Sequence, residues 1–173
     1  MFMEITLDQL LASRDERHSR QMQLLREYPE KTLVCLTVIM PGKVKRNSLS
    51  LTVGEAAASA LNDVFADSGI CHTEVHDLPT GYEAMFVVGT DAATSKMMTC
   101  RLEEEHTLGR LFDVDVINAD GTPMSRTDVG MPPRRCLLCE HEARYCMRNK
   151  THTQEELMAE IEHLVNSYSS IKK

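Results

Sequence analysis

The sequence predicts an α+β fold, a single domain in which helices flank a largely antiparallel or mixed sheet. Three observations support this prediction. Helical and strand-like hydrophobic patterns follow one another in the order α-βαββαβ-β-α. Two pairs of strand-like runs are joined by turn sequences that favour antiparallel neighbours, Pro79-Thr80-Gly81 and Asp120-Gly121. No repeat or low-complexity linker divides the 173 residues, so we expect one domain over 1–173.

The first half of the chain predicts two helices and three strands. A Thr-x-x-Gln or Thr-x-x-Glu pair begins a helix because its two side chains satisfy backbone N–H groups that the first turn leaves free. Pro or Gly ends the run that follows. In chain order we expect a helix over 7–27 begun by Thr6-x-x-Gln9, a strand over 32–40, a helix begun by Thr52-x-x-Glu55 and running to Gly69, and strands near 71–78 and 83–89.

The second half predicts two helices and two strands. Asp is a favoured helix N-cap, and alternating apolar and polar residues indicate a half-buried strand. Asp-Gly is a strong hairpin turn. In chain order we expect a helix over 92–105 capped by Asp91, a strand over 111–118, a strand near 122–127 after Asp120-Gly121, and a last helix begun by Thr153-x-x-Glu156.

Composition indicates a globular protein of a reducing compartment. Hydrophobic residues make up 42% of the chain and charged residues 26%, which is ordinary for such proteins. No apolar stretch approaches the roughly 18 residues of a membrane span, and the amino terminus lacks a secretory pattern. We therefore expect a cytoplasmic protein without a membrane partner, whose six cysteines are thiols or metal ligands. The net charge of −7 argues against nucleic acid as the partner.

The charges are distributed unevenly along the chain. Residues 101–120 contain six acidic and two basic side chains, whereas 131–151 contain five basic and two acidic ones. Lys43, Lys45 and Arg46 form a second basic cluster. An acidic segment flanked by basic segments suits a metal-bound polyphosphate substrate, although ordinary solvated surfaces give the same pattern.

Asp113 and Asp115 form the most informative local pattern. Side chains alternate along a strand, so both carboxylates project from one face and repel each other unless a cation lies between them. Mg²⁺ prefers such oxygen ligands and leaves positions open for phosphate. Just upstream, Gly109 would let the backbone approach a ligand and Arg110 can pair with phosphate. The alternative is an amphipathic strand whose polar face meets water.

The first helix carries polar residues on its predicted apolar face. Advancing 100° per residue from Leu7 places Arg14, His18 and Gln21 inside the apolar stripe and Arg17 on its edge. Two structural explanations are that the helix bends or that Arg14 pairs with a structural carboxylate. The functional explanation is that this face of the helix closes over an anionic pocket. In the last case Arg14 and Arg17 would bind phosphate or the acidic strand.

The Cys/His-rich loop 132–152 contains a candidate zinc set, namely Cys136, Cys139, Cys146 and His152. Cys-x2-Cys is a common chelating unit, and three thiolates with one imidazole complete a tetrahedral shell. The alternative is that these thiols are reduced and buried without a metal.

Three stretches together resemble a known family, the citrate lyase holo-acyl-carrier-protein synthases, also called apo-citrate lyase phosphoribosyl-dephospho-CoA transferases. The resemblance runs over nearly the whole chain and is most specific around the Asp pair and the Cys-x2-Cys unit. The matching segments are LLASRDER at 10–17, HTLGRLFDVDV at 106–116 and PPRRCLLC at 132–139, with Cys146 and His152 downstream and PGKVK at 41–45 upstream.

The resemblance implies a nucleotidyltransferase with a matching active site. Such an enzyme uses 2′-(5″-triphosphoribosyl)-3′-dephospho-CoA, modifies a serine of the citrate lyase acyl carrier protein and releases pyrophosphate. Asp113 and Asp115 would hold Mg²⁺, and His106 is the nearest candidate general base if the metal does not itself lower the pKa of the serine hydroxyl. The residues expected to bind the substrate are Arg14, Arg17, Lys45, Gly109, Arg110, Arg134 and Arg135.

Two other functions fit parts of the same pattern. In the first, the chain is a non-enzymatic zinc-binding adaptor whose segment 132–152 binds a partner and whose Asp113 and Asp115 are surface residues. An enzyme should lose turnover without magnesium, whereas an adaptor would bind its partner regardless. In the second, the same chemistry acts on another acyl carrier protein, such as that of malonate decarboxylase.

Overall fold

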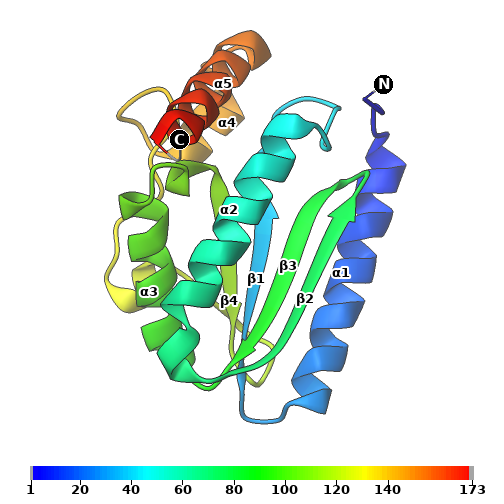
Figure 1. Ribbon diagram of the computed structural model, residues 1–173, viewed down its shortest axis with the longest axis vertical. Coiled ribbons are helices and arrows are strands. Elements are labelled where there is room, and N and C mark those ends of the chain that lie inside the picture. The colour runs from blue at the N-terminus through cyan, green and yellow to red at the C-terminus, as the bar shows by residue number, and fades with distance from the viewer. Residues whose placement is uncertain (1, 172–173) are drawn as a thin grey trace.

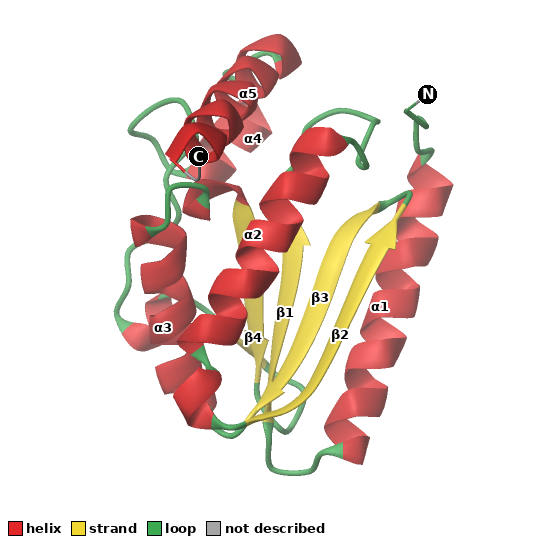
Figure 2. Cartoon of the chain, in the orientation of Figure 1, coloured by secondary structure: helices red, strands yellow, loops and turns green. Residues whose placement is uncertain are grey.

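The computed structural model describes residues 2–171 and confirms a single α+β domain built on a five-stranded antiparallel sheet (Figures 1 and 2). The strands lie in the order β2-β3-β1-β4-β5. Their bounds are β1 Thr32–Val38, β2 Ile70–Leu78, β3 Gly81–Val88, β4 Phe112–Ile117 and β5 Pro123–Met124. The helices are α1 Leu7–Glu27, α2 Ser48–Val64, α3 Ala92–Glu105, α4 Ala143–Asn149 and α5 Gln154–Ile171. Within residues 2–171, no helix combines the length and apolar character that a membrane crossing requires.

Helices α1, α3 and α5 begin at the capping residues that the sequence predicts. At α1 the Gln9 amide donates to Thr6 Oγ1 over 3.2 Å and the Gln9 side chain accepts from the Thr6 amide over 2.9 Å. Asp91 accepts from the Thr94 amide at α3 over 2.9 Å. The Glu156 amide donates to Thr153 Oγ1 over 3.1 Å before α5.

The predicted start of α2 is wrong. The helix begins four residues earlier than Thr52, where Asn47 and Ser50 form the capping box. Asn is at least as good an N-cap as Thr, and here it comes first. Thr52 lies inside the helix and donates its hydroxyl to the Ser48 carbonyl over 3.0 Å. The short helix α4 was not predicted at all.

The sheet has two differently covered faces. On the α2 face, helices α2, α3 and α5 enclose the larger apolar core, and Figure 1 shows α2 crossing in front of the strands. On the opposite, α1 face, a smaller apolar cluster surrounds Leu24 of α1. The members of this smaller cluster are Leu24, Leu33, Cys35, Met85, Val87 and Ile117. The α1 face is therefore apolar mainly beneath the second half of α1.

The predicted apolar stripe of α1 is wrong for the first half of the helix. Leu7 is 69% exposed and Leu11 45% exposed, and Arg14 is exposed as well. The helix instead turns Ser13 and Arg17 toward the sheet. The physical reason is that the strands carry polar side chains there, so this part of α1 meets them with hydrogen bonds and ion pairs. There Ser13 contacts Thr80 and Arg17 contacts Glu83. Polar contacts continue into the second half, where Arg20 contacts Glu74 and Gln21 contacts Cys35.

The outer edge of β4 is closed by side chains. Strand β5 pairs with β4 only at Val116 and Ile117, so the backbone around Val114 has no strand partner on that side. The Val114 amide donates to Glu103 Oε1 over 3.1 Å, and Lys96 Nζ donates to the Val114 carbonyl over 3.0 Å. Because these groups are buried, leaving them unpaired would cost free energy, and the side chains of α3 remove that cost.

Glu103 is the centre of this edge. Its side chain is almost inaccessible, yet it pairs with Arg126 and with Arg134, the latter at 2.7 Å. Arg134 also donates to the Phe112 carbonyl over 2.7 Å. One buried carboxylate thus joins α3, the β4 edge and two loop segments.

We expect Glu103→Gln to lower the free energy of unfolding by roughly 3 kcal/mol, because the neutral amide removes the buried anion that Arg126 and Arg134 share. Only the exposed carboxylates of Glu104 and Asp113 then remain beside them. Urea denaturation measures this change. The matched control is Glu104→Gln. Glu104 also contacts Arg126, at 3.1 Å, but its side chain is exposed, so its loss should cost less than about 1 kcal/mol. Equal losses in the two variants would contradict the central role of Glu103.

Candidate active site and cysteine cluster

Asp113 and Asp115 lie together on the α1 face of the sheet. Along β4 the residues Phe112, Val114 and Val116 are buried, while the two carboxylates between them are exposed. In the sheet register Asp113 lies opposite Thr37 of β1 and Asp115 lies opposite Cys35.

Two donors approach Asp113 from either side. Thr37 Oγ1 donates to Asp113 Oδ2 over 3.4 Å, and Arg134 Nη2 lies 3.5 Å from Asp113 Oδ1. The carboxylate therefore stands between the sheet and the loop that carries Arg134. It remains accessible to a cation from solvent.

The electrostatics of Asp115 favour a bound cation. Desolvation by the surrounding protein raises the pKa of this carboxyl, and the neighbouring Asp113 charge raises it further. The positive charges of Lys96 and Arg17 offset part of this effect. Two accessible oxygen donors that repel each other fit a hard divalent ion such as Mg²⁺. Cys35 does not compete as a ligand, because burial raises the pKa of its thiol to about 12.

Arg134 also lines a cavity of about 340 Å³. This cavity gathers Gly109, Arg110, Arg134 and Arg135, four residues that the sequence predicted to bind substrate, and it adds Arg126. The full lining comprises Glu103, Glu104, Gly109, Arg110, Arg126, Pro132, Pro133, Arg134 and Arg135, and we call it the arginine cavity.

Gly109 has a packing role that the sequence did not indicate. A Cβ at this position would lie 2.4 Å from the Glu103 carbonyl oxygen and 2.6 Å from that of Leu102. The end of α3 therefore requires glycine here, whether or not a ligand approaches the backbone.

The other predicted basic residues form a separate group near the start of α1. Lys45 is half-buried and donates from Nζ to the Met40 carbonyl over 2.6 Å. Burial lowers its pKa, and the positive charge of Arg14 lowers it further. A second cavity of about 460 Å³ lies at this end. Its lining comprises Glu4, Ile5, Thr6, Leu7, Leu10, Gly42, Lys43 and Lys45, and Lys43 lies 3.8 Å from Glu4.

Arg17 lines neither cavity and contacts the sheet. It forms an ion pair with Glu83, and its charge acts on Asp115 and Cys35. Its partner is thus a carboxylate of β3, whereas the sequence predicted phosphate or the acidic strand for Arg17. Arg14, for which a structural carboxylate was the alternative, is exposed.

His106 does not lie with the carboxylates. Its ring centroid is 4.9 Å from that of Phe112 and 5.7 Å from that of Tyr168, both of which belong to the core on the α2 face. Its Nδ1 accepts from the Leu108 amide over 3.0 Å. Because Phe112 and Asp113 point to opposite faces of β4, the structure corrects the interpretation of His106 as a base beside Asp113.

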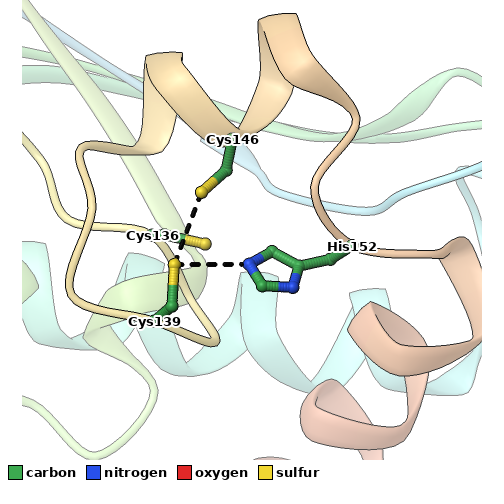
Figure 3. Close-up of side chains that lie close together, drawn as sticks. All are labelled: Cys136, Cys139, Cys146 and His152. Atoms are coloured by element: carbon green, nitrogen blue, oxygen red, sulfur yellow. Dashed lines mark hydrogen bonds between the residues drawn. The ribbon is translucent and has the colours of Figure 1, made fainter.

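Cys136, Cys139, Cys146 and His152 converge on one point. Figure 3 shows the four side chains pointing toward one another, with Cys146 on α4 and His152 on the segment after it. Their ligand atoms all lie within 4.8 Å of one another. Cys139 Sγ is 3.4 Å from Cys146 Sγ and 3.4 Å from His152 Nε2. This set could hold a metal ion.

The backbone around the cluster is tied both to itself and to the arginine cavity. The Cys136 amide donates to the His141 carbonyl over 2.7 Å, and the Ala143 amide donates to the Arg134 carbonyl over 2.8 Å. Arg110 donates from Nη2 to the Cys136 carbonyl. The cysteine loop and the arginine cavity therefore share a wall.

Glu103, Lys96 and Arg126 were missed by the sequence reasoning. A signal for the first two exists, because the buried residues of α3 recur at helical spacing. That stripe consists of Ala92, Ser95, Lys96, Thr99, Cys100 and Glu103. Two opposite charges on a buried stripe indicate paired groups. Arg126 has no comparable signal, because its partners come from another element.

Comparison with known proteins gives consistent matches. A family model described as apo-citrate lyase phosphoribosyl-dephospho-CoA transferase matches residues 5–168. Proteins named apo-citrate lyase phosphoribosyl-dephospho-CoA transferase include one from Escherichia coli O7:K1 (strain IAI39 / ExPEC), 38% identical over 94% of this chain and 89% of the relative. The corresponding Shigella boydii serotype 18 protein gives the same values. A probable transferase of this name from Streptococcus pyogenes serotype M18 is 36% identical over 95% of this chain and 87% of the relative.

We expect Asp115→Asn to raise the melting temperature of metal-free protein at neutral pH. The folded-state pKa of Asp115 is raised, so its ionisation opposes folding above that pKa, and the cost vanishes below the ordinary Asp value of about 4. Thermal melts at pH 7 and below pH 4 test this.

The control for that experiment has the opposite sign. Hydrogen bonds from Thr122 lower the pKa of Asp120, so Asp120→Asn should lower the melting temperature at neutral pH. A drop for Asp115→Asn that matches the drop for Asp120→Asn would contradict the electrostatic account of the site.

Proposed function

The chain belongs to the family of apo-citrate lyase phosphoribosyl-dephospho-CoA transferases, and on this premise we propose which group it transfers and to what. It is an enzyme, and we infer a nucleotidyltransferase. It attaches 2′-(5″-phosphoribosyl)-3′-dephospho-CoA, taken from the triphosphoribosyl precursor, to a serine of the citrate lyase acyl carrier protein. The observation that supports this best is the exposed pair Asp113 and Asp115 beside an arginine-lined cavity.

The proposed reaction is a phosphoryl substitution. The serine oxygen forms a bond to the α-phosphorus of the triphosphate, while the bond from that phosphorus to its bridging oxygen breaks. Pyrophosphate leaves with the bridging oxygen and its electron pair, and the hydroxyl proton passes to solvent. A phosphodiester joins the carrier to the prosthetic group. The protein must therefore neutralise negative charge and orient two reactants.

Asp113 and Asp115 are the residues that would hold Mg²⁺. When bound there, this ion would neutralise phosphate oxygens and lower the pKa of the serine hydroxyl, so a strong protein base is not required. This agrees with the location of His106 on the other face of the sheet. Asp113 would be further oriented by Thr37 and Arg134.

The basic residues divide between two regions of the proposed site. Arg110, Arg134 and Arg135 line the arginine cavity. Arg14 and Lys45 lie at the start of α1, and we propose that they bind another anionic part of the substrate. Arg17 forms an ion pair with Glu83, and its positive charge acts on Asp115. A long substrate with several phosphates suits such a divided site.

Of the two alternative functions, the adaptor is replaced by the family assignment, because the relatives are named as transferases. The other alternative keeps the chemistry and changes the carrier. This alternative would be correct if the enzyme modified the carrier protein of malonate decarboxylase in preference to that of citrate lyase.

We propose that the cysteine cluster holds a structural zinc ion. Thiolates and imidazole are ligands that zinc prefers, and four of them fill a tetrahedral shell without leaving a position for substrate. The ligand atoms already lie close together, within 4.8 Å. The expected compartment is the cytoplasm, where thiols stay reduced and available to a metal.

We expect Asp113→Asn and Asp115→Asn each to reduce transfer more than about a hundredfold, because each removes a proposed magnesium ligand. The assay mixes the enzyme with apo carrier, triphosphoribosyl precursor and Mg²⁺, and follows the mass of the carrier. Asp120→Asn is the control, since Asp120 lies in the turn after β4 and outside the site. Near-normal transfer by either site variant would refute the assignment of the pair.

We expect purified protein to contain one zinc ion per chain, and Cys139→Ser to lose it. Because metal binding contributes directly to folding, a chelator should lower the melting temperature of the parent and leave that of the variant unchanged. Cys71→Ser is the control, since Cys71 is an exposed thiol outside the cluster. Elemental analysis decides the point. Fully active protein without metal would show that the four side chains only pack together.

A further inference from the structure

The arginine cavity is unusual in its charge. Four arginines and two glutamates line its volume of about 340 Å³, so the lining carries an excess of two positive charges. In the whole chain, by contrast, the net charge is −7. Like charges gathered around one space repel each other, and an anion in that space removes the repulsion.

Each of the four arginines has a partner within the protein. Arg126 and Arg134 pair with Glu103, which is only 4% exposed. Arg110 donates to the Cys136 carbonyl. Arg135 pairs with Glu140 at 2.6 Å. Arg126 and Arg134 are therefore preorganised by a buried carboxylate, whereas Arg135 and Glu140 are both exposed and their ion pair orders Arg135 less.

Arg134 connects this cavity to the carboxylate pair. The same guanidinium contacts Glu103 in the cavity wall and lies 3.5 Å from Asp113 Oδ1. A phosphate chain that starts at Asp113 can thus continue past Arg134 into the cavity. Arginine forks match phosphate oxygens in a bidentate manner. They match a carboxylate as well, but four arginines with an excess of two positive charges suit the higher charge of a diphosphate better than a single carboxylate or a neutral sugar.

We propose that the arginine cavity binds the pyrophosphate end of the triphosphate and holds it as the leaving group. This assignment rests on the function proposed above. The α-phosphorus lies at Asp113 and Asp115, and the two terminal phosphates occupy the cavity. When the bond from the α-phosphorus to its bridging oxygen breaks, the pyrophosphate that retains this oxygen stays between the arginines. Free pyrophosphate is then a ligand of the cavity and a product inhibitor.

A second diphosphate occurs in the same substrate, inside its dephospho-CoA portion. The two sources differ in charge and position. Terminal pyrophosphate carries more negative charge than an internal diphosphate and adjoins the reacting phosphorus, so the cavity next to Asp113 fits it better. The internal diphosphate would then lie toward the basic group at the start of α1.

The test measures binding of two probes to the full chain by titration calorimetry: inorganic pyrophosphate with Mg²⁺, and dephospho-CoA. The variants are Arg110→Gln and Arg135→Gln, neither of which removes a partner of buried Glu103. Arg144→Gln is the control, because Arg144 is an exposed residue of α4 outside the cavity lining.

Each cavity variant should weaken pyrophosphate binding by about tenfold or more, the usual effect of losing a charge-assisted hydrogen bond. Dephospho-CoA binding and the Arg144→Gln control should not change. Unchanged pyrophosphate affinity in both cavity variants would overturn the proposal, and so would a selective loss of dephospho-CoA binding.

The transfer assay keeps this result separate from the function itself. Suppose that the parent protein modifies the carrier, but that substituting Arg110 or Arg135 leaves its pyrophosphate affinity unchanged. The proposed function then stands and the assignment of the cavity is wrong. If instead the parent protein modifies no carrier but binds pyrophosphate through these arginines, the anion site stands and the proposed function is wrong.

Discussion

The buried carboxylate of Glu103 is the interaction on which the rest of the structure depends. A carboxylate taken out of water costs several kcal/mol unless charged partners and hydrogen bonds compensate it. Here the compensation comes from Arg126, Arg134 and the Val114 amide. The requirement for these partners fixes the loops that carry the arginines against the edge of β4. The same contacts position Asp113 and form one wall of the arginine cavity, so a stability requirement and the geometry of the site are met by the same atoms.

Local signals predicted most of the fold, and they failed where a second element decides the outcome. The caps at Thr6, Asp91 and Thr153 depend on residues three positions away, so the sequence contains the whole interaction. The stripe of α1 depends on what the sheet offers beneath it. Because that surface is polar, the helix buries Ser13 and exposes Leu7, which no periodicity along α1 could indicate.

The candidate site divides in the same way. The alternation of residues within one strand correctly predicted that both carboxylates lie on one face. The spacing of the three cysteines and His152 correctly predicted that these side chains lie together. His106 precedes the same strand, but the 3-10 turn Gly109–Leu111 lies between them and sets the direction of the chain. Closeness in sequence therefore did not mean closeness in space. Arg126 shows the converse, because it reaches the cavity from a distant loop through a contact with Glu103.

The two candidate metal sites use opposite ligand chemistry, and this suggests how they cooperate. The carboxylate pair is exposed and offers hard oxygen ligands with room for substrate, whereas the cysteine cluster offers a closed set of sulfur and nitrogen ligands. A closed site cannot take part in the reaction directly. It can act only through what it holds, and Arg110 donates to the carbonyl of Cys136. An ordered cluster therefore positions an arginine of the cavity through one hydrogen bond. The cavity in turn shares Arg134 with the carboxylate pair, so contacts connect the loop, the cavity and the strand, along which we propose that the phosphate chain binds.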